Sequence, residues 1–159
     1  MKIECTIDGS TLSLSLNSNK PLSRILMDNL DNKSINTHCK GKMCGQCIVL
    51  INSKPVLSCM VPAFEIRGKN IITFEAFQKT KNYSDIEKAY EIVRAKPCPN
   101  CFNAKTLIFE SLIARGETDA EDIIRELSIV KCQCLNDQDA VKIVKEAIEI
   151  RRKRRVRRS

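Results

Sequence analysis

The sequence predicts an α+β protein with a sheet-forming first half and an all-helical second half. In the first half, apolar and polar residues alternate with the period of two that is typical of half-buried strands. From Ser84 onward, apolar residues recur with the 3.6-residue period of amphipathic helices. A polar segment between the two patterns is the expected linker. The expected divisions are a first domain at 1–77, a linker at 78–83, a helical domain at 84–150 and a basic tail at 151–159.

Two β-hairpins and one helix are expected in the first half. Alternation before and after Asp8-Gly9 predicts one hairpin, and the apolar segments 48–51 and 55–57 around Asn52-Ser53 predict another. Pro21 suits the first turn of a helix, which would carry an apolar stripe on its buried side. That stripe consists of Leu22, Ile25, Leu26 and Leu30. Residues 70–77 are expected to form the last strand of a mixed sheet.

Four short amphipathic helices are expected in the second half. Ser84–Glu87 and Thr118–Glu121 both match the capping box, in which a hydroxyl and a carboxylate bind the free N–H groups at a helix start. Gly116 suits a helix end. The apolar positions at helical spacing are Ile86, Ala89, Tyr90 and Val93, then Ile108, Phe109, Leu112 and Ile113, then Ala120, Ile123, Ile124 and Leu127, then Val141, Val144 and Ile148.

Nine cysteines are the most unusual feature of the composition. The N-terminal residues contain no apolar export signal, so we expect a cytoplasmic protein whose thiols stay reduced, and metal binding then explains the cysteines better than disulfides. No apolar run is long enough to cross a membrane. Cys5 stands alone on the first strand and is expected to be a small buried hydrophobe. The other eight form two groups, Cys39, Cys44, Cys47 and Cys59, and Cys98, Cys101, Cys132 and Cys134.

The first cysteine group has the spacing of a plant-type ferredoxin. Cys39, Cys44 and Cys47 are separated by four and then two residues, and Cys59 follows at a distance. Gly41 and Gly45 would let the backbone N–H groups of the loop turn toward the sulfurs. Structural zinc sites usually combine two short cysteine pairs, and only one such pair occurs here. This group therefore predicts a [2Fe-2S] cluster.

The second cysteine group is ambiguous when it is considered alone. The pair Cys98 and Cys101 lies near the start of the second expected helix, and the pair Cys132 and Cys134 lies between the third and the fourth. Two short pairs about thirty residues apart suit zinc as well as an iron-sulfur cluster.

Both groups in this order, with a sheet-forming domain before four helices, resemble the iron-sulfur subunit of the molybdenum hydroxylases, the xanthine dehydrogenase and carbon monoxide dehydrogenase family. The resemblance covers residues 2–150. It implies an N-terminal β-grasp domain of the 2Fe-2S ferredoxin type and a four-helix domain, each holding one [2Fe-2S] cluster. The implied ligands are Cys39, Cys44, Cys47 and Cys59 for the cluster nearer the flavin, and Cys98, Cys101, Cys132 and Cys134 for the cluster nearer the molybdopterin.

The resemblance also implies partners and a role. The chain would belong to a hetero-oligomer with a molybdopterin-binding large subunit and an FAD-binding subunit, and would carry electrons from the first to the second. The sequence departs from the family around the second cysteine group: Pro97 stands where the family has a glutamine that hydrogen-bonds the pterin, and Leu135 stands where it has a threonine.

The net charge of +8 is concentrated at the C-terminus. Seven basic side chains lie in the last nine residues, which leaves about +1 for the rest of the chain. We expect the tail to be a solvated extension or an anchor on an acidic partner. We do not expect a nucleic-acid partner, because the body of the chain offers no basic surface, and we expect no membrane partner either.

No catalytic set can be assembled from the sequence, so any enzyme activity would belong to the whole complex. We expect an electron-transfer subunit. Two alternatives stay open: a free-standing ferredoxin with two clusters, and a zinc-binding interaction module.

Overall fold

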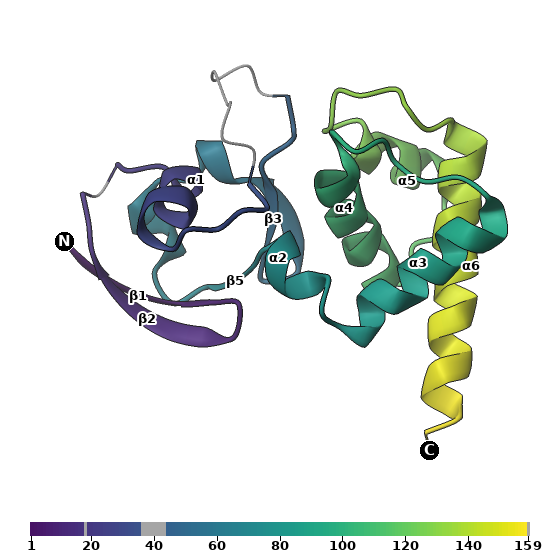
Figure 1. Ribbon diagram of the computed structural model, residues 1–159, viewed down its shortest axis with the longest axis horizontal. Coiled ribbons are helices and arrows are strands. Elements are labelled where there is room, and N and C mark those ends of the chain that lie inside the picture. Colours follow the sequence, from purple (N-terminus) through teal and green to yellow (C-terminus); the bar gives the residue numbers. More distant parts are fainter. Residues whose placement is uncertain (18, 36–43, 159) are drawn as a thin grey trace.

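The described residues form a sheet-containing half and a helical half that lie side by side (Figure 1). The computed structural model describes residues 1–17, 19–35 and 44–158. The strands of the first half are β1 (Lys2–Ile7), β2 (Ser10–Ser15), β3 (Ile48–Ile51), β4 (Lys54–Leu57) and β5 (Asn70–Ile72). Its helices are the short α-helices α1 (Leu22–Arg24) and α2 (Phe74–Phe77), the π-helix η1 (Ile25–Asn29) and the 3₁₀ helices η2 (Ser58–Met60) and η3 (Ala63–Ile66). The second contains α3 (Lys81–Val93), α4 (Phe102–Ala114), α5 (Ala120–Leu127) and α6 (Asp137–Val156). The expected mixture of a sheet and helices is confirmed.

The sheet has five strands in the order β2-β1-β5-β3-β4. The β1–β5 pair is parallel and the other pairs are antiparallel. Both predicted hairpins are present. Each turns through two residues with positive φ, Asp8 and Gly9 in the first and Asn52 and Ser53 in the second, which suits the right-handed twist of the flanking strands.

The predicted last strand over 70–77 is wrong at its end, because β5 stops at Ile72 and the short helix α2 follows. The carboxylate of Asp8 explains the stop. It accepts hydrogen bonds from the Thr73 backbone N–H at 2.7 Å and from the Thr73 hydroxyl at 2.8 Å, which turns the chain away from the sheet. The turn buries Phe74 and Phe77 against the helical half.

Two helices begin at residues other than those predicted. The cap of α3 is Thr80, whose hydroxyl accepts from the Tyr83 N–H at 3.2 Å, so the predicted linker is partly helical. Ser84 lies inside this helix. The cap of α5 is Asp119 rather than Thr118, and its carboxylate accepts from the Asp122 N–H at 3.0 Å. Asp and Thr both stabilise helix starts, so neighbouring candidates compete.

The two halves share a buried interface at β3. Val49 and Ile51 face a core formed with β1 and α1, whereas Ile48 and Leu50 face a core formed with the helices. Alternate residues of a strand point to opposite faces, so a strand covered on both sides is apolar throughout. All four residues of β3 are buried.

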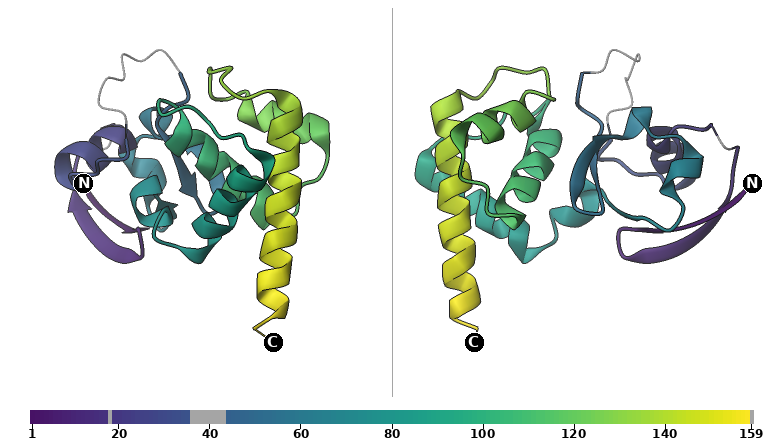
Figure 2. Two further views of the ribbon diagram at one scale, coloured as in Figure 1. Left: turned by 45° about the vertical axis from the view of Figure 1, so that its right-hand side comes forward. Right: turned by 180° about the vertical axis from the view of Figure 1, so that it is seen from behind.

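The basic tail is helical for most of its length. Helix α6 continues to Val156, and Figure 2 shows its C-terminal end projecting beyond the rest of the helical half. Arg151 is only 3% exposed and pairs with Asp85 and Glu110. The expected solvated extension is therefore wrong for Arg151, and Arg154 of the tail also pairs with Asp85. In the part of the chain that the structure describes, no helix combines the length and apolar character needed to span a membrane.

Candidate metal centre

The second cysteine group converges on one point. Cys98 and Cys101 lie in the turn before α4, and Cys132 and Cys134 lie in the loop from α5 to α6. The four Sγ atoms all lie within 4.8 Å of one another. Four thiols at this separation form a donor set for a thiophilic metal or an iron-sulfur cluster, because both bind deprotonated cysteine.

Individual distances show how the two cysteine pairs meet. The Sγ of Cys98 lies 3.5 Å from that of Cys101 and 3.6 Å from that of Cys132. Cys101 and Cys134 approach to 3.2 Å, and the Cys98 backbone N–H donates to the Cys134 sulfur at 3.3 Å.

The backbone around this group stabilises negative charge on sulfur unequally. Hydrogen bonds from Cys101, first of all from its backbone N–H, lower the pKa of the Cys98 thiol to about 6. Burial raises the pKa of Cys101 and also that of Cys132. Of these three thiols, Cys98 therefore loses its proton most readily, and the deprotonated thiolate is the form that binds a metal.

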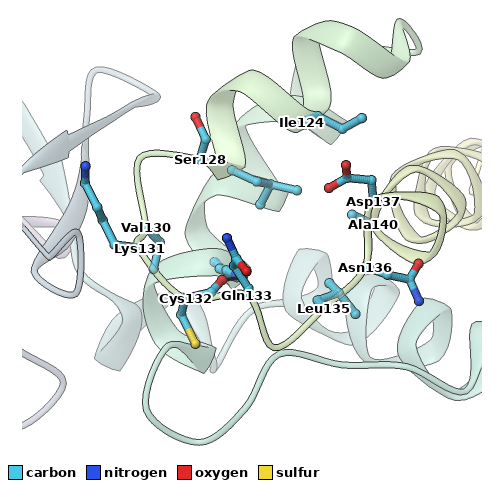
Figure 3. A pocket seen from close by; sticks show the side chains of 12 residues that line it. Ile124, Ser128, Val130, Lys131, Cys132, Gln133, Leu135, Asn136, Asp137 and Ala140 are labelled. Atoms are coloured by element: carbon cyan, nitrogen blue, oxygen red, sulfur yellow. Dashed lines mark hydrogen bonds between the residues drawn. The ribbon is translucent and has the colours of Figure 1, made fainter.

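The loop that carries Cys132 also borders a cavity of about 700 Å³. Figure 3 shows Cys132 and Gln133 on this loop, with Leu135 and Asn136 leading into α6. Lys105 lines the same cavity from α4 and is only 4% exposed. Sequence reasoning did not identify Lys105, although a lysine within an apolar stretch of a buried helix was a visible signal.

The first cysteine group is described in part. Cys39 lies outside the described residues, as does Gly41. Cys47 and Cys59 lie at one end of the β3–β4 hairpin, and the Cys59 N–H donates to the Cys47 sulfur at 3.5 Å. Cys47 is buried and Cys44 is partly exposed. The hairpin thus brings together two cysteines that are separated by eleven residues in the sequence.

The two cysteine groups are joined by a backbone contact. The Lys131 N–H, next to Cys132, donates to the Cys44 carbonyl at 3.0 Å. Beside this bond Gly45 adopts a φ of +85°, and a Cβ built on it would lie 2.5 Å from the carbonyl oxygen of Ile129. Sequence analysis related Gly45 only to the first cysteine loop, because a contact between two distant loops leaves no local pattern.

Two further residues singled out in the sequence are buried. Cys5 is 3% exposed in the core under the sheet, and burial raises the pKa of its thiol, so the expectation of a buried apolar role is confirmed. Pro97 is also buried.

No protein-family model matches the chain. It is 28% identical over 152 residues to one subunit of the nicotinate dehydrogenase of Pseudomonas putida, covering 95% of this chain and 97% of the relative. It is 29% identical over 145 residues to the xanthine dehydrogenase iron-sulfur-binding subunit of Escherichia coli O157:H7, covering 89% and 91%.

The fold is similar to that of solved structures. A chain of quinoline 2-oxidoreductase from Pseudomonas putida 86 superimposes with a TM-score of 0.77 at 20% identity, and 96% of each chain is covered. The predicted resemblance to the iron-sulfur subunits of the molybdenum hydroxylases is therefore confirmed, both in sequence and in fold.

Proposed function

We propose, from this resemblance, that the chain is an electron-transfer subunit that holds two [2Fe-2S] clusters, one in a β-grasp domain of the ferredoxin type and one in a four-helix domain. The observation that carries the proposal is the convergence of Cys98, Cys101, Cys132 and Cys134 from two distant segments within 4.8 Å. When bound, such clusters accept and release one electron at a time. The protein supplies the thiolates, the surrounding hydrogen bonds and the burial that tune this exchange.

The other four ligands would be Cys39, Cys44, Cys47 and Cys59. Support comes from their ferredoxin spacing and from the hairpin, which brings Cys47 and Cys59 to one place. The Lys131–Cys44 hydrogen bond would then join the two ligand sets through a short backbone bridge. A continuous bonded route of this kind favours electron exchange between the sets.

Zinc is the principal competing occupant of the helical site. With Zn–S distances of about 2.3 Å, a tetrahedral zinc site places its sulfurs ~3.8 Å apart. This is close to the 3.5 and 3.6 Å that separate the Cys98 sulfur from those of Cys101 and Cys132. A two-iron cluster needs the thiolates of different irons to stand farther apart. The segment 131–136, which carries Cys132 and Cys134, contains no helix or strand, so no element of regular structure fixes the separation of these two thiols from Cys98 and Cys101. We favour the cluster because one of the two relatives is named for iron-sulfur binding.

The proposed partners are a molybdopterin-binding large subunit and an FAD-binding subunit. Electrons would enter the helical half and leave from the sheet half, and the chain itself would hold no catalytic residue. Cys134 is exposed at the helical site, so this site reaches the surface where a partner could approach. Pro97 is buried and its side chain offers no hydrogen bond to a pterin. We therefore expect a pterin to contact this site through other groups.

Metal and sulfide analysis tests the proposal directly. The chain purified without oxygen should contain about four irons and four acid-labile sulfides, two of each per cluster. Cys132→Ser should remove about half of both, because only one ligand set is broken. Cys5→Ser is the matched control and should keep both clusters, because Cys5 belongs to neither proposed ligand set, although it shares the sheet core with Cys47.

The same preparation separates the alternatives. Stoichiometric zinc without labile sulfide would overturn the proposal in favour of a zinc module. Two clusters in a chain that copurifies with no molybdenum or flavin subunit from its native cells would instead identify a free-standing ferredoxin.

A further inference from the structure

Lys105 is a buried cation beside the helical cysteine group. Its side chain lies on the first turn of α4 and is almost fully enclosed. The Nζ atom donates to the Cys132 carbonyl at 2.6 Å and lies 3.7 Å from the Cys134 sulfur. Among the described residues, no carboxylate lies within ion-pair distance of this ammonium.

This position is unfavourable for a lysine unless a negative charge lies nearby. Burial of an unpaired ammonium is costly, because the protein interior replaces its hydration poorly. The start of a helix also carries partial positive charge, which repels a cation. The anionic groups that the structure places beside Nζ are the cysteine sulfurs once they are deprotonated. Lys105 therefore suits a site whose cysteines are deprotonated and hold a metal or a cluster.

We infer that Lys105 raises the reduction potential of the cluster proposed at Cys98, Cys101, Cys132 and Cys134. The inference rests on the proposed function. A [2Fe-2S] cluster with four thiolates is already an anion, and reduction adds one electron without breaking any bond to the protein. A fixed ammonium in a low-dielectric site stabilises the reduced cluster more than the oxidised cluster, because the reduced cluster carries one more negative charge. Reduction therefore becomes easier. The electron would come from the proposed molybdenum subunit and leave toward the flavin.

Lys105 also holds the ligand loop in place. Its hydrogen bond to the Cys132 carbonyl connects α4 with the loop that supplies the two later thiols. A purely structural role and an electrostatic role predict different results. Loss of the hydrogen bond alone changes cluster content, whereas loss of the charge changes the potential of a cluster that is still assembled.

A redox titration followed by electron paramagnetic resonance measures the charge effect. In Lys105→Met we expect the helical-half cluster to become harder to reduce by at least a tenfold change in its one-electron equilibrium constant, about 59 mV. Lys105→Arg should stay near wild type, because it keeps the charge. The cluster of the sheet half is an internal reference and should keep its potential in every variant.

Two further variants keep the test decisive. Lys142→Met removes one exposed positive charge from α6 and should leave both potentials unchanged, since water screens that charge. If Lys105→Met loses iron, Lys105→Gln retains a hydrogen-bond donor without the charge and should show the same negative shift. Unchanged potentials in fully loaded Lys105→Met or Lys105→Gln would overturn the inference. Wild-type protein without labile sulfide would instead overturn the proposed function.

Discussion

Replacement of Arg151 by methionine should lower the free energy of unfolding by about 3–5 kcal/mol, because it leaves the buried Glu110 carboxylate without its cation and removes one of the two cations on Asp85. Arg151 donates to Asp85 at 3.0 Å and to Glu110 at 2.7 Å, and all three side chains are nearly or fully buried. Burial opposes ionisation of Asp85, but hydrogen bonds from Arg154 and Arg151 outweigh it and lower the pKa of this carboxyl. The network ties the end of α6 to α3 and α4.

Urea unfolding of the anaerobic protein measures this effect. Arg155→Met is the matched control: it removes the same charge from an exposed position of the same helix and should change stability by less than about 0.5 kcal/mol. Adding Glu110→Leu to Arg151→Met should recover part of the loss, since one unpaired carboxylate is then removed. Equal stability of Arg151→Met and Arg155→Met would show that the buried network contributes nothing.

Replacement of Gly45 by alanine should destabilise the chain and separate its two cysteine groups. A positive φ costs a residue with a Cβ about 1–3 kcal/mol. The new Cβ would also lie 2.5 Å from the Ile129 carbonyl oxygen and 2.6 Å from the Val130 Cα, and relief of such overpacking typically costs a further ~1–3 kcal/mol. Because these contacts are backbone atoms, the loop before Cys132 must move, and the Lys131–Cys44 hydrogen bond should weaken.

Gly9→Ala is the matched control for this variant. Gly9 has the same φ of +85° but nothing within 4 Å of the position of its Cβ, so only the conformational cost applies. We expect Gly45→Ala to unfold at lower urea than Gly9→Ala and to show a weaker magnetic interaction between the two proposed clusters. If both variants lose the same stability and keep the wild-type interaction, the contact at Gly45 does not connect the two sites.

Much of the local structure could be predicted because its causes are local. The turns at Asp8-Gly9 and Asn52-Ser53, the helix after Pro21 and the four later helices each depend on neighbouring residues, namely turn formers, caps and apolar spacing. The two groups of four cysteines could also be predicted, because the spacing of metal ligands is a property of the sequence itself. At the helical site, the cysteine spacing alone suits both zinc and an iron-sulfur cluster, so it does not predict which one binds.

By itself, then, the sequence determined the periodicities, the two hairpins and the two sets of possible ligands. Only the tertiary structure decided that the last strand ends at Ile72, because Asp8 binds the next residue, Thr73, from 65 positions earlier in the chain. It likewise decided that Arg151, the first residue of the basic tail, pairs with buried carboxylates, and that Lys105 lies beside the Cys134 sulfur. These outcomes depend on charges and hydrogen-bond donors that meet only after the halves pack, so no local pattern of residues can reveal them.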